Sequence, residues 1–200
     1  MGRRPAFDPD AVLAGARDAF WANGFEGTSL DDLLKATGLS KSSLYSSFGT
    51  KEQLFLAAYD TYRDDRAQEM RDLLTAHPGL EGVRAFFQLI IERDPASHLG
   101  YGCLSMNQGF EQAHRVPAIR ERVSGDLDLI RDALHEALLE GQRLGQVRPN
   151  ADTAAAADAL ANAFVGFQLT VRAQLDRARL ANTLDYLLAP LATDPTDLPE

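Results

Sequence analysis

Residues 28–55, with the sequence TSLDDLLKATGLSKSSLYSSFGTKEQLF, constrain the fold more than any other part of the chain. Ser29 and Ser40 are residue types that favour a helix start, because a serine hydroxyl accepts a hydrogen bond from the free N–H groups of the first turn. Between the two predicted helices lies Gly38, which tolerates the positive φ angle of a tight turn. Apolar residues that can pack the two helices together are Leu30, Leu33, Leu34, Leu39, Leu44 and Phe48. The pattern predicts a helix-turn-helix.

The second of these helices presents a polar face without a carboxylate. From Ser40 to Lys51 there is no Asp or Glu. The stretch offers cations and hydroxyls instead, at Lys41, Ser42, Ser43, Tyr45, Ser46, Ser47, Thr50 and Lys51. Such side chains suit the phosphates and base edges of a DNA major groove, where a carboxylate would be repelled. The face alone would also suit a solvated helix of an ordinary bundle, so both interpretations stay open at this point.

The sequence around this motif resembles the DNA-binding signature of the TetR family of bacterial one-component regulators. The resemblance covers GFEGTSLDDLLKATGLSKSSLYSSFGTKEQLF and is most specific at Thr28-Ser29, Gly38-Leu39-Ser40-Lys41, Leu44-Tyr45-x-x-Phe48 and Lys51-Glu52-x-Leu54. It implies that phosphates are held by Thr28, Lys41, Tyr45 and Lys51, and that base edges are faced by Ser42, Ser43 and Ser46. Because no Arg on this face can grip a guanine, we expect few base contacts and a contribution from DNA shape.

Helical periodicity without any strand pattern predicts an all-α chain. We expect a three-helix helix-turn-helix head at residues 1–49, a larger helical domain at 50–193 and a disordered tail at 194–200. The expected helices run over residues 9–22, 30–36, 40–48, 51–75, 80–93, 103–114, 118–144, 153–175 and 177–191. The helix that starts at Lys51 belongs to both domains, so we expect it to transmit a conformational change from one to the other. The family resemblance assigns effector binding and dimerisation to the larger domain.

The last two predicted helices are more apolar than one small domain needs. In the family that the chain resembles, the corresponding pair forms a four-helix bundle across a two-fold axis. A homodimer is also what two recognition helices on a palindromic double-stranded DNA operator require. The alternative is that these helices only close the core of a monomer.

The charge and the cysteine content indicate how such a protein binds DNA and in which cellular compartment it is found. The net charge is −9, yet residues 1–55 hold six Lys and Arg against seven Asp and Glu, so most of the acidity belongs to the larger domain. We therefore expect salt-sensitive DNA binding and weak non-specific binding. A single cysteine fits a reducing cytosol, and no signal peptide or apolar run of about 18 residues is evident, which predicts a cytoplasmic protein without membrane association.

Cys103 is the one candidate for reactive chemistry outside the head. It lies at the start of a predicted helix, where free N–H groups can lower the pKa of a thiol, so a redox or electrophile sensor is one interpretation. The other is a small buried apolar residue. His98, Cys103, Glu111 and His114 match no common zinc pattern, and no third residue or oxyanion loop completes a hydrolytic dyad. We expect no metal, no cofactor and no catalytic residue.

The middle helices carry aromatic and amphipathic residues suited to a mostly apolar pocket for an unknown small-molecule effector. The candidates are Phe86, Phe87, Tyr101, Cys103, Met106, Asn107, Phe110, Phe164, Phe167 and Gln168. We predict a transcriptional regulator, a repressor more readily than an activator because repression needs only occupancy of a promoter. The alternatives are a helical ligand-binding protein or enzyme without specific DNA affinity, and an architectural DNA binder that responds to no ligand.

Overall fold

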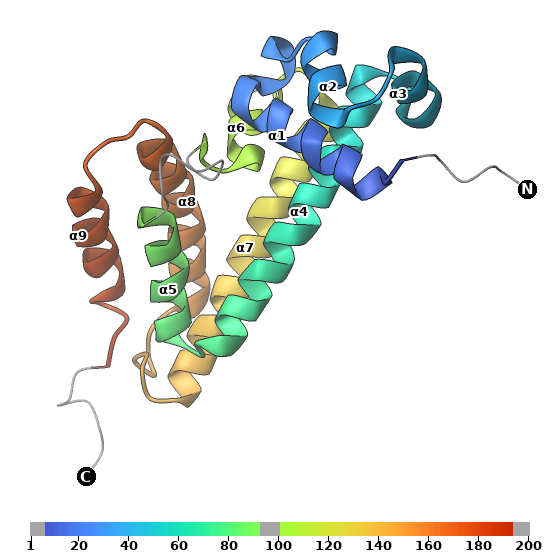
Figure 1. Ribbon diagram of the computed structural model, residues 1–200. Helices are drawn as coiled ribbons and strands as arrows, with labels where there is room; N and C mark the ends of the chain where they lie inside the picture. Colours follow the sequence, from blue (N-terminus) through green and yellow to red (C-terminus); the bar gives the residue numbers. More distant parts are fainter. Residues whose placement is uncertain (1–6, 93–100, 194–200) are drawn as a thin grey trace, which may run out of the picture. The chain divides into compact units, whose positions relative to one another are not determined.

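The computed structural model describes residues 7–92 and 101–193. Its helices are α1 (Pro9–Gly27), α2 (Leu30–Thr37), α3 (Lys41–Phe48), α4 (Lys51–Ala76), α5 (Leu80–Ile91), α6 (Leu104–Glu111), α7 (Pro117–Arg143), α8 (Thr153–Arg172) and α9 (Arg177–Leu188). Figure 1 shows them in chain order. Extended pairing over the described ranges is limited to one isolated bridge between Val147 and Ala192. The prediction of an all-α fold is confirmed.

The chain divides into two compact units, residues 1–66 and 67–200, and the division falls inside α4. The first unit holds α1 to α3 together with the first four turns of α4. The expected boundary at residues 49 and 50 marks the end of the helix-turn-helix rather than this division, and it stays a prediction. The expected tail at 194–200 lies outside the described residues.

Helix α1 begins as its sequence predicts but ends later. The Asp8 side chain accepts a hydrogen bond from the Asp10 N–H, and Pro9 occupies the first turn, where its missing N–H costs nothing. The helix was expected to stop near Ala22, because Gly24 follows. Gly24 does break the helical geometry, with φ 76° and ψ 170°, but one further turn follows it and extends α1 to Gly27.

Aromatic side chains join α1 to the start of α4 within the first unit. The Phe20 ring meets Phe55 edge to face at 5.0 Å between centroids, and Trp21 meets Tyr62 in the same way at 5.0 Å. All four are almost fully buried. Such pairs contribute about 0.5–1.5 kcal/mol each beyond the area they bury. Trp21 thus packs inside the head.

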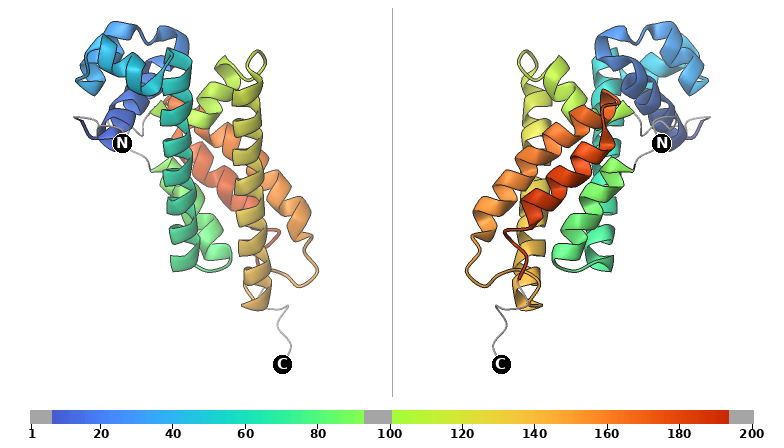
Figure 2. Two further views of the ribbon diagram at one scale, coloured as in Figure 1. Left: turned by 90° about the vertical axis from the view of Figure 1, so that its right-hand side faces the viewer. Right: turned by 90° about the vertical axis from the view of Figure 1, so that its left-hand side faces the viewer.

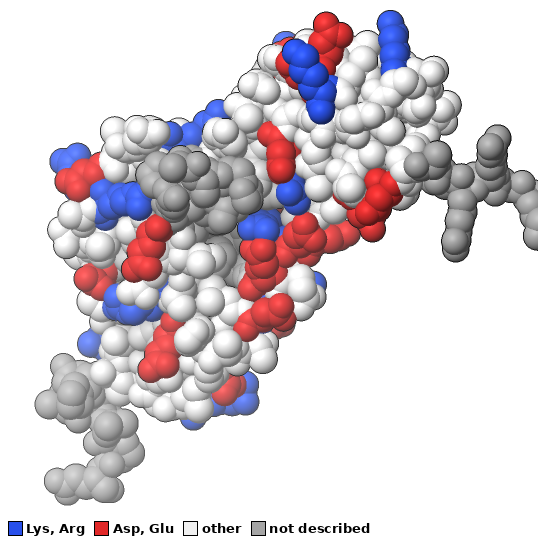
Figure 3. Space-filling model, viewed as in Figure 1, with Lys and Arg blue, Asp and Glu red and all other residues white. Residues whose placement is uncertain are grey.

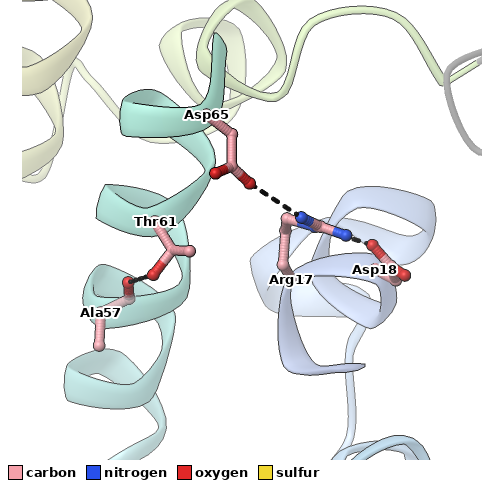
Figure 4. Close-up of polar contacts among 5 residues, drawn as sticks. All are labelled: Arg17, Asp18, Ala57, Thr61 and Asp65. Atoms are coloured by element: carbon pink, nitrogen blue, oxygen red, sulfur yellow. Dashed lines mark hydrogen bonds and ion pairs between the residues drawn. The ribbon is translucent and has the colours of Figure 1, made fainter. Parts of the chain in front are cut away.

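An ion pair on the surface adds to this connection. Arg17 of α1 lies 2.9 Å from Asp18 on the same helix and 3.5 Å from Asp65 on α4, as Figure 4 shows. On α4 itself, Thr61 donates a hydrogen bond to the Ala57 carbonyl at 3.2 Å. Because Asp18 and Asp65 are half exposed, each pair is worth at most about 1 kcal/mol. The aromatic contacts, not these charges, hold α4 to α1.

The second unit is built around α8, which packs against α5, α6, α7 and α9 (Figures 1 and 2). The α7–α8 loop is fastened to the segment that follows α9: the Arg148 N–H donates to the Leu191 carbonyl at 2.9 Å, and the Thr193 N–H donates to the Gln146 carbonyl at 3.0 Å. The Gln146 side chain also accepts from the Leu80 N–H at 2.8 Å, which fixes the start of α5. These hydrogen bonds hold the α7–α8 loop, the segment after α9 and the start of α5 together at one end of the helical domain.

Helix α8 is apolar for its length. Within the described residues it is the one helix long and apolar enough, by length and composition alone, to cross a membrane. Polar residues such as Asp158, Asn162 and Gln168 interrupt it, so it is not the continuous apolar run that the sequence was expected to lack. A core helix meets the same criteria, and α8 buries Leu160, Phe164 and Phe167 inside the second unit.

Candidate functional site

The helix-turn-helix forms as its local signals predict. Ser29 and Asp32 make a reciprocal cap: the Ser29 Oγ accepts from the Asp32 N–H at 3.2 Å, and the Asp32 carboxylate accepts from the Ser29 N–H at 2.9 Å. Hydrogen bonds from the Ser29 hydroxyl and N–H hold the pKa of Asp32 below its ordinary value. Gly38 ends α2 with φ 67°. Leu33 of α2 and Leu44 of α3 are fully buried in the head.

Helix α3 exposes a face of hydroxyls with one cation, Lys41. Its N-cap Ser40 accepts a hydrogen bond from the Ser43 N–H at 3.2 Å. Lys41, Ser42, Tyr45 and Ser46 are exposed, and their spacing places them on one side of the helix. The predicted contact residues of α3 are therefore brought together on the surface of the head.

Ser43 is placed differently from the other predicted base-contact residues. It is half-buried, and its hydroxyl accepts a hydrogen bond from the Ser40 Oγ at 2.9 Å. The Ser46 hydroxyl donates to the Ser43 carbonyl at 3.1 Å, a bond it can exchange for a partner outside the helix. The Ser42 hydroxyl also meets the Ser40 Oγ, at 3.1 Å, but Ser42 and Ser46 are exposed and are therefore better placed than Ser43 to meet a base edge.

Thr28 is turned into the head rather than toward solvent. Its side chain is fully buried, and its hydroxyl donates to the Gly24 carbonyl at 2.6 Å with a longer contact of 3.3 Å to the Ala19 carbonyl. The Ala19 carbonyl also accepts from the Asn23 side-chain amide at 3.1 Å. The side chain therefore closes the end of α1, and its hydroxyl is engaged inside the head, so the phosphate contact expected of Thr28 stays a prediction.

The start of α4 favours an anion. Thr50 and Gln53 cap each other, with the Thr50 N–H donating to the Gln53 Oε1 at 2.8 Å and the Gln53 N–H donating to the Thr50 Oγ1 at 3.1 Å. The Lys51 ammonium lies 4.5 Å from the centroid of the Phe25 ring. Free N–H groups and the positive end of the helix dipole add to the positive potential of this ammonium, and together they favour a bound anion.

Acidic side chains are frequent along α4. Glu52 lies in the first turn beside Lys51, and farther along the helix follow Asp60, Asp64, Asp65, Glu69 and Asp72. Figure 3 shows one face of the molecule, on which red carboxylates and blue cations are interspersed. DNA binding by the head therefore depends on the local field at α3 and the start of α4 rather than on net charge.

Four aromatic residues predicted for an effector site do meet, inside the second unit. Phe86 of α5 stacks on Phe164 of α8 at 5.7 Å between centroids, and Phe87 meets Phe167 edge to face at 5.0 Å. All four rings are buried. The sequence pattern thus identified a real aromatic cluster between α5 and α8, which we call the aromatic cluster below.

Gln168, one turn along α8 from Phe164, carries an unsatisfied acceptor. The residue is 4% exposed, and its Oε1 atom has no hydrogen-bond partner. Most buried side-chain oxygens are paired, and leaving one unpaired costs about 1–3 kcal/mol. An orphan acceptor beside the aromatic cluster is a polar group to which a bound molecule can donate.

The remaining predicted effector residues are split between the inside and the surface. Met106 and Cys103 are buried, at 5% and 8% exposure. Asn107 donates to the Tyr101 carbonyl at 2.9 Å, and Arg172 of α8 donates to the same carbonyl at 2.8 Å, which fastens this turn to α8. Phe110 is 63% exposed, so it lines no buried pocket; the helical period of α6 does not reveal which side a neighbour covers.

Polar residues that the sequence did not single out are buried on α6 and at its C-terminal cap. Gln108 and Gln112 are buried, and the Gln112 amide donates to the Gln108 carbonyl oxygen at 2.9 Å. Ser105 is also buried and donates to Asp126 of α7 at 2.6 Å. Their spacing of three and four along α6 could have indicated a shared buried face, but polar side chains usually mark a solvated one.

The buried thiol of Cys103 does not favour the sensor interpretation, because reactivity needs an accessible thiolate. Its position fits the alternative of a small apolar residue. His98, considered as a metal ligand, lies outside the described residues. Among those that are described, no group of three His, Cys, Asp or Glu side chains is arranged to hold a metal ion.

Comparisons with known proteins agree with this geometry. Residues 12–58 match the family model for bacterial regulatory proteins of the tetR family, and residues 79–187 match the tetracyclin repressor-like C-terminal domain. The chain is 31% identical over 196 residues to the uncharacterized HTH-type transcriptional regulator YezE of Bacillus subtilis (strain 168), covering 96% of this chain and 100% of that one. It is 30% identical over 173 residues to the HTH-type transcriptional repressor ComR of Escherichia coli (strain K12), covering 86% and 82%.

Solved structures give the same result for the fold and the head. A cysteine mutant of the TetR family transcriptional regulator CifR, complexed with 26-bp double-strand operator DNA, superposes with a TM-score of 0.81 at 28% identity and covers 94% of this chain and 98% of that one. The capped helix pair, its exposed cationic face and the helical domain define a helix-turn-helix transcriptional regulator. The chain belongs to the TetR family of bacterial regulatory proteins.

Proposed function

We propose that this regulator is a repressor that occupies a palindromic operator as a homodimer and leaves it when a small-molecule effector binds. The observation that carries the proposal is the exposed face of α3, where Lys41, Ser42, Tyr45 and Ser46 stand without a carboxylate among them. CifR was solved with operator DNA, and ComR is named a repressor. Occupancy of a promoter is sufficient for repression, so the action needs binding alone, without a catalytic residue or cofactor, in the cytoplasm.

In this proposal the DNA contacts divide between two helices. Lys41 and Tyr45 of α3 and Lys51 of α4 hold phosphates, while Ser42 and Ser46 reach base edges. Ser43 and Thr28 support the contacts from inside the head, because their hydroxyls are engaged there. Phosphate contacts fix the register of the helix, and the small hydroxyls leave much of the sequence choice to DNA shape.

Replacing Lys41 or Tyr45 by Ala is expected to weaken operator binding by about 10-fold to 100-fold, since each change removes one contact from both protomers and each is worth about 1 kcal/mol or slightly more. For Lys41→Ala the slope of log affinity against log salt concentration should also become shallower by about 1.8, because two phosphates are no longer neutralised. Fluorescence anisotropy on DNA from upstream of the protein's own gene measures both quantities.

Arg71→Ala is the matched control for these variants. Arg71 is exposed on α4 in the second unit, so the substitution changes net charge by the same amount as Lys41→Ala without touching the head. It should leave affinity within about two-fold, as distant screened charges do. Tight binding by folded Lys41→Ala and Tyr45→Ala proteins would instead point to a helical ligand-binding protein that lacks specific DNA affinity.

We place the dimer contact on α8 and α9. Large apolar side chains remain exposed on these helices and in the turn between them in a single protomer: Leu169 at 53%, Leu175 at 58% and Tyr186 at 81%. Helix α8 is apolar along its length, yet only part of it is buried within one chain. A second copy related by two-fold symmetry would cover such a face and would set the spacing of two heads on a palindrome.

We place the effector beside the aromatic cluster, with Gln168 as its polar anchor. Phe86, Phe87, Phe164 and Phe167 supply apolar contact area, and the unpaired Oε1 of Gln168 supplies an acceptor. An effector that fits is an apolar or aromatic molecule with at least one N–H or O–H donor. Its binding to one of two states of the regulator would shift the population away from the DNA-bound one.

Replacing Gln168 by Leu is expected to raise the free energy of unfolding by about 1–2 kcal/mol, because it removes a buried acceptor that has no partner while keeping the side-chain volume. Gln146→Leu is the control: the Gln146 oxygen accepts from the Leu80 N–H at 2.8 Å, so this change should cost about 1 kcal/mol. Urea unfolding at fixed protein concentration measures both. Equal losses in the two variants would show that the Gln168 oxygen is already satisfied.

A further inference from the structure

Lys51 and Phe25 meet although they lie on different helices. Phe25 is in the last turn of α1, and Lys51 is the first residue of α4. The 4.5 Å between the ammonium and the ring centroid is well inside the range of about 6 Å in which a cation is attracted to the face of an aromatic ring. Both residues are only partly exposed, which reduces the screening of this attraction by water.

The ring that receives Lys51 is held by its neighbours. Phe25 stacks on Phe20 at 6.0 Å and 15°, and meets Phe55 edge to face at 5.2 Å. Phe20 and Phe55 are each 1% exposed, so they form a fixed base. The turn that carries Phe25 follows Gly24, whose φ of 76° and ψ of 170° suit glycine and strain other residues. The head thus presents this ring in one orientation.

A fixed ring restricts a side chain that is otherwise very mobile. A lysine that binds phosphate must give up most of its rotamer freedom, and this loss opposes binding. When the ring attracts the ammonium before DNA arrives, part of that loss has already occurred in the free protein. The ammonium has three N–H donors, so one side can face the ring while another meets a phosphate oxygen. No ion pair joins Lys51 to a carboxylate in the described part of the chain, so its charge is available.

We propose that Phe25 is a positioning residue for DNA binding: it holds Lys51 by a cation–π interaction in the orientation that meets a backbone phosphate. The proposal rests on the proposed phosphate contact of Lys51. It gives Phe25 an electronic role in addition to its packing in the head. The Phe25 ring therefore contacts the buried rings of Phe20 and Phe55 as well as the Lys51 ammonium at the start of α4.

Fluorination of the Phe25 ring separates the two roles. Phenylalanine with one, two or three ring fluorines keeps the shape of the side chain but progressively weakens the negative face of the ring. We expect affinity for a duplex from upstream of the protein's own gene to fall stepwise, by about 5-fold to 20-fold with three fluorines, since a partly exposed contact of this kind is worth about two-fold to five-fold in each protomer. The salt slope should stay unchanged, because Lys51 keeps its charge.

The same fluorinated series in a Lys51→Met background is the control. Lys51→Met alone should weaken binding and make the salt slope shallower by about 1.8, and fluorination should then have no further effect. A loss on fluorination that is the same in both backgrounds, or absent from both, would assign Phe25 a packing role only and overturn the proposal. If Lys51→Met leaves affinity and slope unchanged, the phosphate contact itself is wrong, and the role of Phe25 falls with it.

Discussion

The free energy of unfolding is expected to fall by about 3–5 kcal/mol when Phe87 is replaced by Ala. The Phe87 ring is fully buried and makes edge-to-face contacts with Phe86 at 5.5 Å and Phe167 at 5.0 Å. Removing the ring loses the free energy gained by burying a large apolar side chain. It also leaves a cavity between α5 and α8, because two packed helices can move together only in part to fill it. Urea unfolding followed by circular dichroism, at one protein concentration for all variants, measures the change.

Leu89→Ala on the same helix is the control for Phe87→Ala. Leu89 is 51% exposed, so the substitution tests the loss of an apolar side chain from α5 without a cavity. It should change the free energy of unfolding by no more than about 0.5 kcal/mol. Similar small effects for both variants would mean that α5 and α8 are not tightly packed, and the aromatic cluster could then not define a site for the effector.

The head was predictable from sequence because its signals are local. Ser29, Gly38 and Ser40 act within a few residues of their own position, and each is found as a cap or a turn. The burial of Leu33 and Leu44 follows from the same short-range pattern. A cap depends only on hydrogen bonds to the next turn, so it can be predicted without knowledge of the rest of the fold.

What sequence could not provide depends on contacts between distant segments. Gly24 interrupts α1 as its position predicts, but a further turn follows it and packs Phe25 on Phe20 and Phe55. That turn brings Phe25 to Lys51, and the Thr28 hydroxyl donates to the Gly24 carbonyl. The contact of Phe25 with Lys51 could not be found in the sequence, because the two residues lie on different helices.

The helical domain shows a second limit of sequence patterns. Periodicity correctly grouped Phe86 and Phe87 with Phe164 and Phe167, because large apolar residues at helical spacing must be buried somewhere. It placed Phe110 with them, although that ring is 63% exposed, and it overlooked Gln108, which is fully buried. Which side of a short helix is covered depends on its neighbours, here α7 and α8, and not on its own residues.

Replacing Gly15 by Ala is expected to lower the stability of the head by about 2–3 kcal/mol, at the upper end for overpacking, and to weaken operator binding at least about 10-fold. A Cβ atom at Gly15 would lie 2.4 Å from the Ala36 carbonyl oxygen and 3.1 Å from its carbon, so α1 and α2 would have to separate. The obstacle is backbone, which cannot rotate away, and the helix propensity of Ala offsets only about 1 kcal/mol. Because α2 positions α3, the displacement would reach the contact face.

Trp21 makes this effect measurable in the head alone. It is the only tryptophan of the chain and is 2% exposed within the first unit, so its fluorescence during urea unfolding reports on the head rather than on the helical domain. Gly27→Ala is the matched control: it lies on the same helix, and its Cβ would meet only the Asn23 Cβ at an ordinary 3.8 Å. That variant should be neutral or slightly stabilised. If Gly15→Ala matches it in stability and in operator affinity, α1 and α2 have room to adjust, and their close approach does not set the position of α3.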